Sequence, residues 1–90
     1  MHYLYILYSK RIDRYYSGET GDVGRRLRKH NDGHSAATKK GVPWELKKVI
    51  EFETKTEAIK AEKWLKKMKS RRVIEKVIRG EIDLKDITLG

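Results

Sequence analysis

The stretch that most constrains the fold lies at the start of the chain. Residues 3–8 combine three tyrosines with two leucines and an isoleucine, a composition that favours a β-strand. Because side chains alternate along a strand, Leu4 and Ile6 share one face, and the odd-numbered residues share the other. Residues 9–13 form a polar connection, and residues 14–17 can return as a second, antiparallel strand. The sequence therefore predicts an opening hairpin.

The signals that follow predict helices around one further strand. Thr20 can cap a helix over about residues 21–31, in which Asp22 adds a favourable negative charge to the first turn. Residues 32–44 carry turn residues and predict a loop, whereas residues 47–53 predict a third strand.

Two more helix starts follow the third strand. Thr54 and Glu57 form a capping box that begins a helix to about residue 69, and Ser70 can cap a further helix to residue 79. The expected fold class is α/β, with a small, three-stranded, mostly antiparallel sheet flanked by helices in the order β-β-α-β-α-α. We expect one domain over residues 1–80 and a short C-terminal tail over residues 81–90, with a last turn around Asp83.

Charge indicates the kind of partner. The 22 Lys and Arg residues exceed the 13 Asp and Glu residues, which gives a formal net charge of +9. A basic domain of this kind usually binds nucleic acid, although the same lysines can simply be solvated. The positions expected to contact nucleic acid are Arg25, Lys29, Lys39, Lys40, Lys66, Lys69, Arg71 and Arg72.

Some classes of protein are excluded by what the sequence lacks. The chain has no cysteine, which excludes disulfides and cysteine-ligated zinc. It has no apolar run near the ~18 residues of a membrane span and no secretory signal. We therefore expect a cytoplasmic protein with no membrane partner.

Two polar side chains stand beside the apolar stripes of the expected helices. His30 shares a helix face with Val23 and Leu27, and Arg26 lies one turn before it. Glu62 lies within the apolar stripe of the next helix, where a carboxylate needs a partner. Each has a structural explanation as well, since a histidine can end a helix by chance and Glu62 can pair with Lys66 at i+4.

The five tyrosines all lie within the first 16 residues and would crowd one hairpin. They can serve as strand residues alone. Tyr3 and Tyr5 nevertheless point away from Leu4, on the same side as either Tyr15 or Tyr16, depending on the register of the hairpin.

The spacing of these residues resembles the GIY-YIG nuclease superfamily, and within it the small stand-alone members. The first motif is Tyr3-Leu4-Tyr5 and the second is Tyr16-Ser17-Gly18, with Tyr5 and Tyr16 eleven positions apart. Arg26 follows ten residues after Tyr16, and His30 four residues later.

The resemblance covers about residues 3–75. Residues 56–58, followed by Glu62, look like the segment that supplies the acidic metal ligand of the family, and residues 39–46 are similar to a loop of the small members. The chain departs from the family pattern at Ser17, where Ile or Val is usual, and at Glu19, where Lys is common. It also lacks the late asparagine of some members.

The resemblance implies a divalent-metal-dependent endonuclease with a catalytic set of Tyr5, Tyr16, Arg26, His30 and Glu62. Glu62 would hold Mg²⁺ or Mn²⁺, Arg26 would grip a phosphate oxygen, and Tyr5 would act as general base with help from His30. Tyr16 would orient water or phosphate through its hydroxyl.

DNA is favoured over RNA as the substrate. No sequence-reading domain accompanies the motifs, so we expect low sequence specificity, with a protein partner as one way to choose the target. Two other interpretations stay open: a non-catalytic nucleic-acid-binding module on the same fold, and a basic structural protein of a ribonucleoprotein.

Overall fold

The computed structural model describes residues 1–89. The elements of the N-terminal half are β1 (His2–Ser9), β2 (Arg14–Thr20), α1 (Val23–Asn31) and a 3-10 turn, η1 (Lys39–Gly41). Those of the C-terminal half are β3 (Glu45–Phe52), α2 (Lys55–Met68), α3 (Arg71–Ile78) and α4 (Leu84–Leu89). The predicted α/β order is confirmed, with a turn inside the expected loop and a short last helix as additions.

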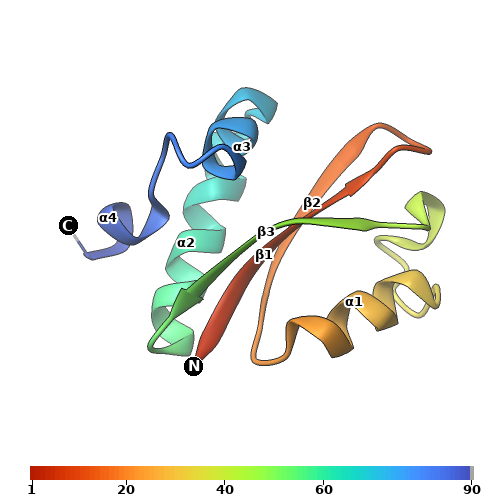
Figure 1. The fold of residues 1–90 in the computed structure, drawn as a ribbon, viewed down its shortest axis with the longest axis horizontal. Helices are drawn as coiled ribbons and strands as arrows, with labels where there is room; N and C mark the ends of the chain where they lie inside the picture. Colours follow the sequence, from red (N-terminus) through yellow and green to blue (C-terminus); the bar gives the residue numbers. More distant parts are fainter. Residues whose placement is uncertain (90) are drawn as a thin grey trace.

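The three strands form one antiparallel sheet in the order β2-β1-β3. The tyrosine-rich strand β1 is therefore central, and helices cover both of its faces. Figure 1 shows α1 on one side of the sheet and α2, α3 and α4 on the other. Burial on both faces explains why β1 carries apolar residues at successive positions rather than in alternation.

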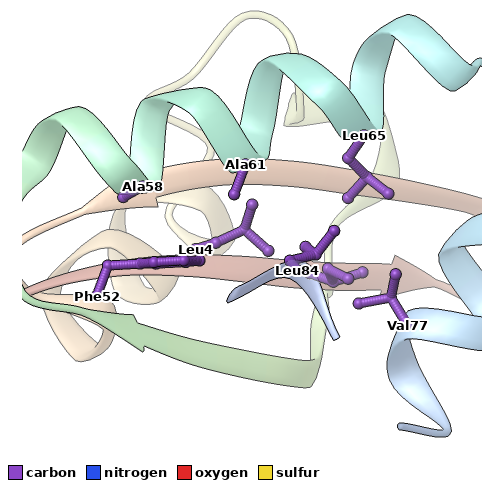
Figure 2. Close-up of a cluster of buried hydrophobic side chains, with 8 residues drawn as sticks. Leu4, Phe52, Ala58, Ala61, Leu65, Val77 and Leu84 are labelled. Carbon is purple, nitrogen blue, oxygen red and sulfur yellow. The ribbon is translucent and has the colours of Figure 1, made fainter. Parts of the chain in front are cut away.

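The larger core lies between the sheet and the C-terminal helices. Figure 2 shows Leu4 and Phe52 of the sheet beneath the small side chains Ala58 and Ala61 of α2. Alanines at these positions let the helix approach the sheet closely. The remaining buried members of this core are Ile6, Leu65, Val77 and Leu84.

Leu84 is fully buried, although it belongs to the segment expected to be a tail. It packs with Val77 of α3 and Leu65 of α2 (Figure 2). Burying an aliphatic side chain of this size stabilises a fold by about 1.5–3 kcal/mol, so α4 contributes to the stability of the domain.

The N-cap residues of α2 and α3 are those predicted from the sequence, whereas that of α1 is not. Thr54 accepts a hydrogen bond from the Glu57 amide and Ser70 accepts one from the Val73 amide, as predicted. The prediction that Thr20 caps α1 is wrong, because β2 extends through Thr20 and the helix begins two residues later than expected. The cap is Asp22, whose carboxylate accepts a hydrogen bond from the backbone amide three residues on, at 3.0 Å.

The tip of the hairpin is tied to α3. The Tyr8 hydroxyl donates a hydrogen bond of 2.5 Å to Asp13, and Arg71 reaches the same carboxylate at 2.8 Å. The Arg71 guanidinium and then the Tyr8 hydroxyl hold the pKa of Asp13 down at about 2. The guanidinium also lies over the Tyr15 ring, 5.2 Å from its centroid, so the hairpin and α3 are fixed relative to each other.

Candidate active site

Tyr5 lies at the centre of the site, on the face of β1 that α1 covers. It pairs with Gly18 across β2, and its ring occupies the space above that glycine. A Cβ at position 18 would lie 2.4 Å from the Tyr5 hydroxyl oxygen, so only glycine permits this position of the ring. Gly18 of the second motif therefore leaves the space that the ring of Tyr5, in the first motif, occupies.

A chain of polar contacts extends from Tyr5 into the protein. The Tyr5 hydroxyl lies 3.0 Å from Nε2 of His30, and Nδ1 of His30 lies 2.7 Å from the Thr38 hydroxyl. His30 and Thr38 are only 2% and 1% exposed. Water therefore has little access to this chain, and the two contacts fix the imidazole ring from both of its nitrogens.

The loop between α1 and β3 is held so that Thr38 faces His30. The Trp44 indole donates a hydrogen bond of 2.7 Å to the Thr38 carbonyl. The side-chain amide of Asn31 accepts from the Trp44 amide at 2.6 Å and donates to the Trp44 carbonyl at 3.2 Å. Gly41 lies against the indole, where a Cβ would come within 2.3 Å of the ring.

Tyr16, rather than Tyr15, shares the face of Tyr5. Tyr16 pairs with Leu7, whereas Tyr15 pairs with Tyr8 on the opposite face. The register of the hairpin thus settles which of the two tyrosines joins the site.

The Tyr16 ring closes one side of the site. Its centroid lies 6.5 Å from that of Tyr5 and 5.1 Å from that of His30, with an edge-to-face geometry toward the imidazole. The ammonium of Lys66 lies 5.7 Å from the same centroid. Tyr16 therefore links the residues on β1 and α1 to helix α2.

Arg26 lies one helical turn before His30 on the exposed side of α1. Its positive charge opposes the rise in the pKa of Tyr5 that burial causes, and it adds to the fall in the pKa of His30 that burial causes. Arg26 shares a shallow cavity of about 430 Å³ with Arg25 and Lys29, so three cations of α1 meet beside the site.

Glu62 approaches the site from α2. Its side chain is 21% exposed, and one carboxylate oxygen lies 3.4 Å from the ammonium of Lys66. After burial and the Tyr16 phenol, its negative charge adds to the rise in the pKa of Tyr5. The structural interpretation is confirmed, because Glu62 is partly buried and pairs with Lys66, whereas its role as a metal ligand stays a prediction.

Burial favours the neutral forms of the Tyr5 phenol and the His30 imidazole. Desolvation, followed by the nearby Tyr16 phenol, raises the pKa of Tyr5 well above its ordinary value. Desolvation and then the Arg26 charge lower the pKa of His30. Burial therefore disfavours the charged form of each of the two groups.

The other basic residues expected at a nucleic acid fall into two groups. Lys39 and Lys40 are exposed on η1, directly after Thr38. The second group lies on or after α2 and comprises Lys66, Lys69, Arg71 and Arg72, all exposed. Of these, Arg71 is engaged by ion pairs with Asp13 and Glu75.

Thr38, Asn31 and Trp44 are the structural residues of the site that the motifs do not reveal. Each acts through the path of the loop over residues 32–44, and the spacing along the chain carries no signal for that path. The exception is Trp44, a large aromatic residue inside a polar loop, which could have indicated a buried anchor.

Comparison with known proteins agrees with this geometry. Residues 1–75 match the GIY-YIG catalytic domain. The chain belongs to the GIY-YIG family. Within that family it is similar to a UPF0213 protein of Bacillus licheniformis, with 38% identity over 91% of this chain and 88% of the relative. It is also similar to the UPF0213 protein YazA of Bacillus subtilis, with 40% identity over 74% of this chain and 68% of the relative.

A solved structure of this GIY-YIG group supports the fold. The solution NMR structure of a UPF0213 protein from Bacillus halodurans superposes with a TM-score of 0.56 at 38% identity. The match covers 87% of this chain and 82% of that one. Within residues 1–89, none of the helices has the length and apolar character needed to cross a membrane.

Proposed function

We propose that this GIY-YIG protein is a divalent-metal-dependent endonuclease that hydrolyses phosphodiester bonds, preferentially in DNA and with low sequence specificity. The observation that carries the proposal is the 3.0 Å contact between the Tyr5 hydroxyl and His30, with Arg26 exposed one turn before His30 and Glu62 partly buried on α2.

The residues at Glu62 fit a hard divalent cation. Among residues 1–89 no three His, Asp or Glu side chains gather as a metal cluster, so the protein would supply one carboxylate. Mg²⁺ and Mn²⁺ accept such a site, because water and phosphate oxygens complete their coordination. When bound, the ion supplies Lewis acidity at the phosphate and the leaving oxygen. The exposed ammonium of Lys66 can move aside at little cost.

The side chains then divide the work of hydrolysis. The oxygen of a water molecule forms a bond to phosphorus while the bond from phosphorus to the leaving oxygen breaks. The leaving oxygen keeps the electron pair of that bond and takes a proton from solvent water. The proton of that water passes to the Tyr5 hydroxyl as Tyr5 passes its own proton to Nε2 of His30, 3.0 Å away. Arg26 binds a non-bridging oxygen and offsets the charge that develops there, and Tyr16 orients the water or the phosphate.

Binding would use the basic side chains on both sides of the site. We expect the affinity for DNA to fall steeply as salt increases, because phosphate contacts release counterions. A protein partner can supply the selectivity that the domain itself lacks. We expect the protein to act in the cytoplasm.

The assay that tests this function follows cleavage of labelled single-stranded, duplex and branched DNA, and of matching RNA, with Mg²⁺, Mn²⁺ or EDTA. Arg26→Ala should abolish cutting, while Arg28→Ala on the same helix should retain most of it. Binding without cutting on every substrate would instead favour the non-catalytic module. Equal activity in both variants would contradict the role of Arg26.

A further inference from the structure

A groove beside the site is lined mostly by residues that the proposed hydrolysis does not use. It has a volume of about 650 Å³ and lies between β2 on one side and α2 and α3 on the other. Its floor is apolar and includes Tyr15, Leu65 and Ile74. A volume of this size is typical of sites that take a small organic group rather than a single ion.

The rim of the groove is cationic. Arg14, Lys66, Lys69 and Arg71 all line it. Of the described residues that line it, Asp13 carries the only carboxylate, and its charge is matched by Arg71 at 2.8 Å. Glu75, next to the floor residue Ile74, is likewise paired with Arg71, at 3.5 Å. The groove therefore combines an aromatic and aliphatic floor with positive charge at its entrance.

The groove is continuous with the site. Tyr16 lines the groove and also packs against His30. Lys66 lies over the Tyr16 ring and pairs with Glu62, so its ammonium lies at the boundary between groove and site. A strand bound at the site can therefore extend past Tyr16 and Lys66 into the groove.

We propose that this groove binds the nucleotide next to the scissile phosphate, with its base taken out of the duplex stack and laid on the apolar floor. This inference rests on the proposed function and deepens it. The floor supplies an apolar surface against which a base of any identity can pack, beside the Arg71 guanidinium that lies over the Tyr15 ring, and the rim supplies the cations for its phosphate. The protein would then select unpaired or extruded nucleotides without reading their sequence.

The test measures binding in EDTA, so that it does not depend on cleavage. A single-stranded oligodeoxynucleotide and the matching blunt duplex are titrated into the isotope-labelled protein and followed by NMR. The single strand is expected to shift the resonances of Tyr15, Ile74 and Lys69, and the duplex to leave them nearly unchanged. Shifts confined to α1, or equal shifts with the duplex, would overturn the proposal.

A matched pair of variants separates the groove from general charge. Lys69→Glu changes the rim directly after α2, whereas Lys67→Glu makes the same charge change at an exposed position of α2 that does not line the groove. Affinity for the single strand should fall about tenfold further in Lys69→Glu than in Lys67→Glu. Equal losses would overturn the proposal.

The base itself is tested with an abasic nucleotide placed at successive positions of the strand. At one position its affinity should fall about fivefold or more, as loss of a stacked base does elsewhere. If the affinity falls at none of the positions, the proposed binding of a base in the groove is overturned. Cleavage of DNA without NMR shifts of the groove residues would overturn the groove proposal and leave the proposed nuclease function standing. Binding in the groove without cleavage under any metal would support the groove and contradict the nuclease function.

Discussion

Replacing Thr38 by valine removes one hydroxyl from behind His30 and changes little else. The two side chains have nearly the same shape, so the effect isolates the 2.7 Å contact with Nδ1 of the imidazole. Both residues are almost fully buried, and water cannot readily replace the lost partner. A buried nitrogen left without a partner costs about 1–3 kcal/mol. The backbone contact from the Trp44 indole to the Thr38 carbonyl remains.

The assay is urea unfolding followed by tryptophan fluorescence. The free energy of unfolding should fall by about 1–3 kcal/mol in Thr38→Val. Thr38→Ser, which keeps the hydroxyl, should recover most of the loss. Thr56→Val makes the same chemical change at an exposed position of α2 and serves as the control. An unfolding curve of Thr38→Val that coincides with the unmodified protein would refute the buried contact.

The same variant tests the positioning of His30 in cleavage. If Thr38 fixes the ring that accepts the Tyr5 proton, kcat should fall about tenfold or more while KM stays close to its original value. Thr38→Ser should restore kcat. A parallel change in KM, or an unchanged kcat in folded Thr38→Val, would exclude this positioning role.

Three further predictions concern the packing and titration of the site and the hairpin. Gly18→Ala should destabilise the fold by about 1–3 kcal/mol and abolish cleavage, because the new Cβ would overlap the Tyr5 hydroxyl. Gly24→Ala in α1 is the control and should be tolerated. Urea unfolding and the cleavage assay measure both variants. Burial lowers the pKa of His30, so protons bind preferentially to the unfolded chain. The contribution of His30 to the free energy of unfolding is therefore complete above about pH 6.5 and declines as the pH falls toward the pKa of the folded state. Unfolding measured over a range of pH tests this. Asp13 should titrate with a pKa of about 2 in carbon-detected NMR, far below an ordinary aspartate.

Each of these has a contradicting result. Full cleavage by Gly18→Ala would show that the Tyr5 ring does not depend on the glycine beneath it. Stability that rises as the pH falls below 6.5 would reverse the sign expected for His30, and a series on His30→Gln shows whether the slope belongs to this residue. An ordinary midpoint for Asp13 would mean that the hairpin tip is not anchored as described.

The fold could be predicted where the signals are local. The caps at Thr54 and Ser70 depend on residues within one turn, and the sequence predicts both correctly. The pairing of Glu62 with Lys66 is equally local, one turn apart on a helix. Thr20 shows the limit, because its place in β2 is set by pairing with the opening strand rather than by its neighbours in the chain.

The site could be predicted only in part. Its five catalytic candidates, Tyr16 among them, come from motif spacing. Strand alternation alone leaves Tyr15 and Tyr16 open as the partner of Tyr5, because that choice requires the register of the hairpin. Thr38 escapes prediction for a similar reason. It lies eight positions after His30, and the contact depends on how the loop returns to β3.

The central claim, that this GIY-YIG protein hydrolyses phosphodiesters with a cation held by Glu62, is tested most directly by one cleavage measurement. Unmodified protein, Glu62→Gln and the exposed control Glu53→Gln are incubated with labelled DNA over a range of Mg²⁺ and Mn²⁺ concentrations, with EDTA as the blank. The account predicts metal-dependent cutting by the unmodified protein and the control, and none by folded Glu62→Gln. Equal cutting by Glu62→Gln, or cutting that persists in EDTA, would contradict it.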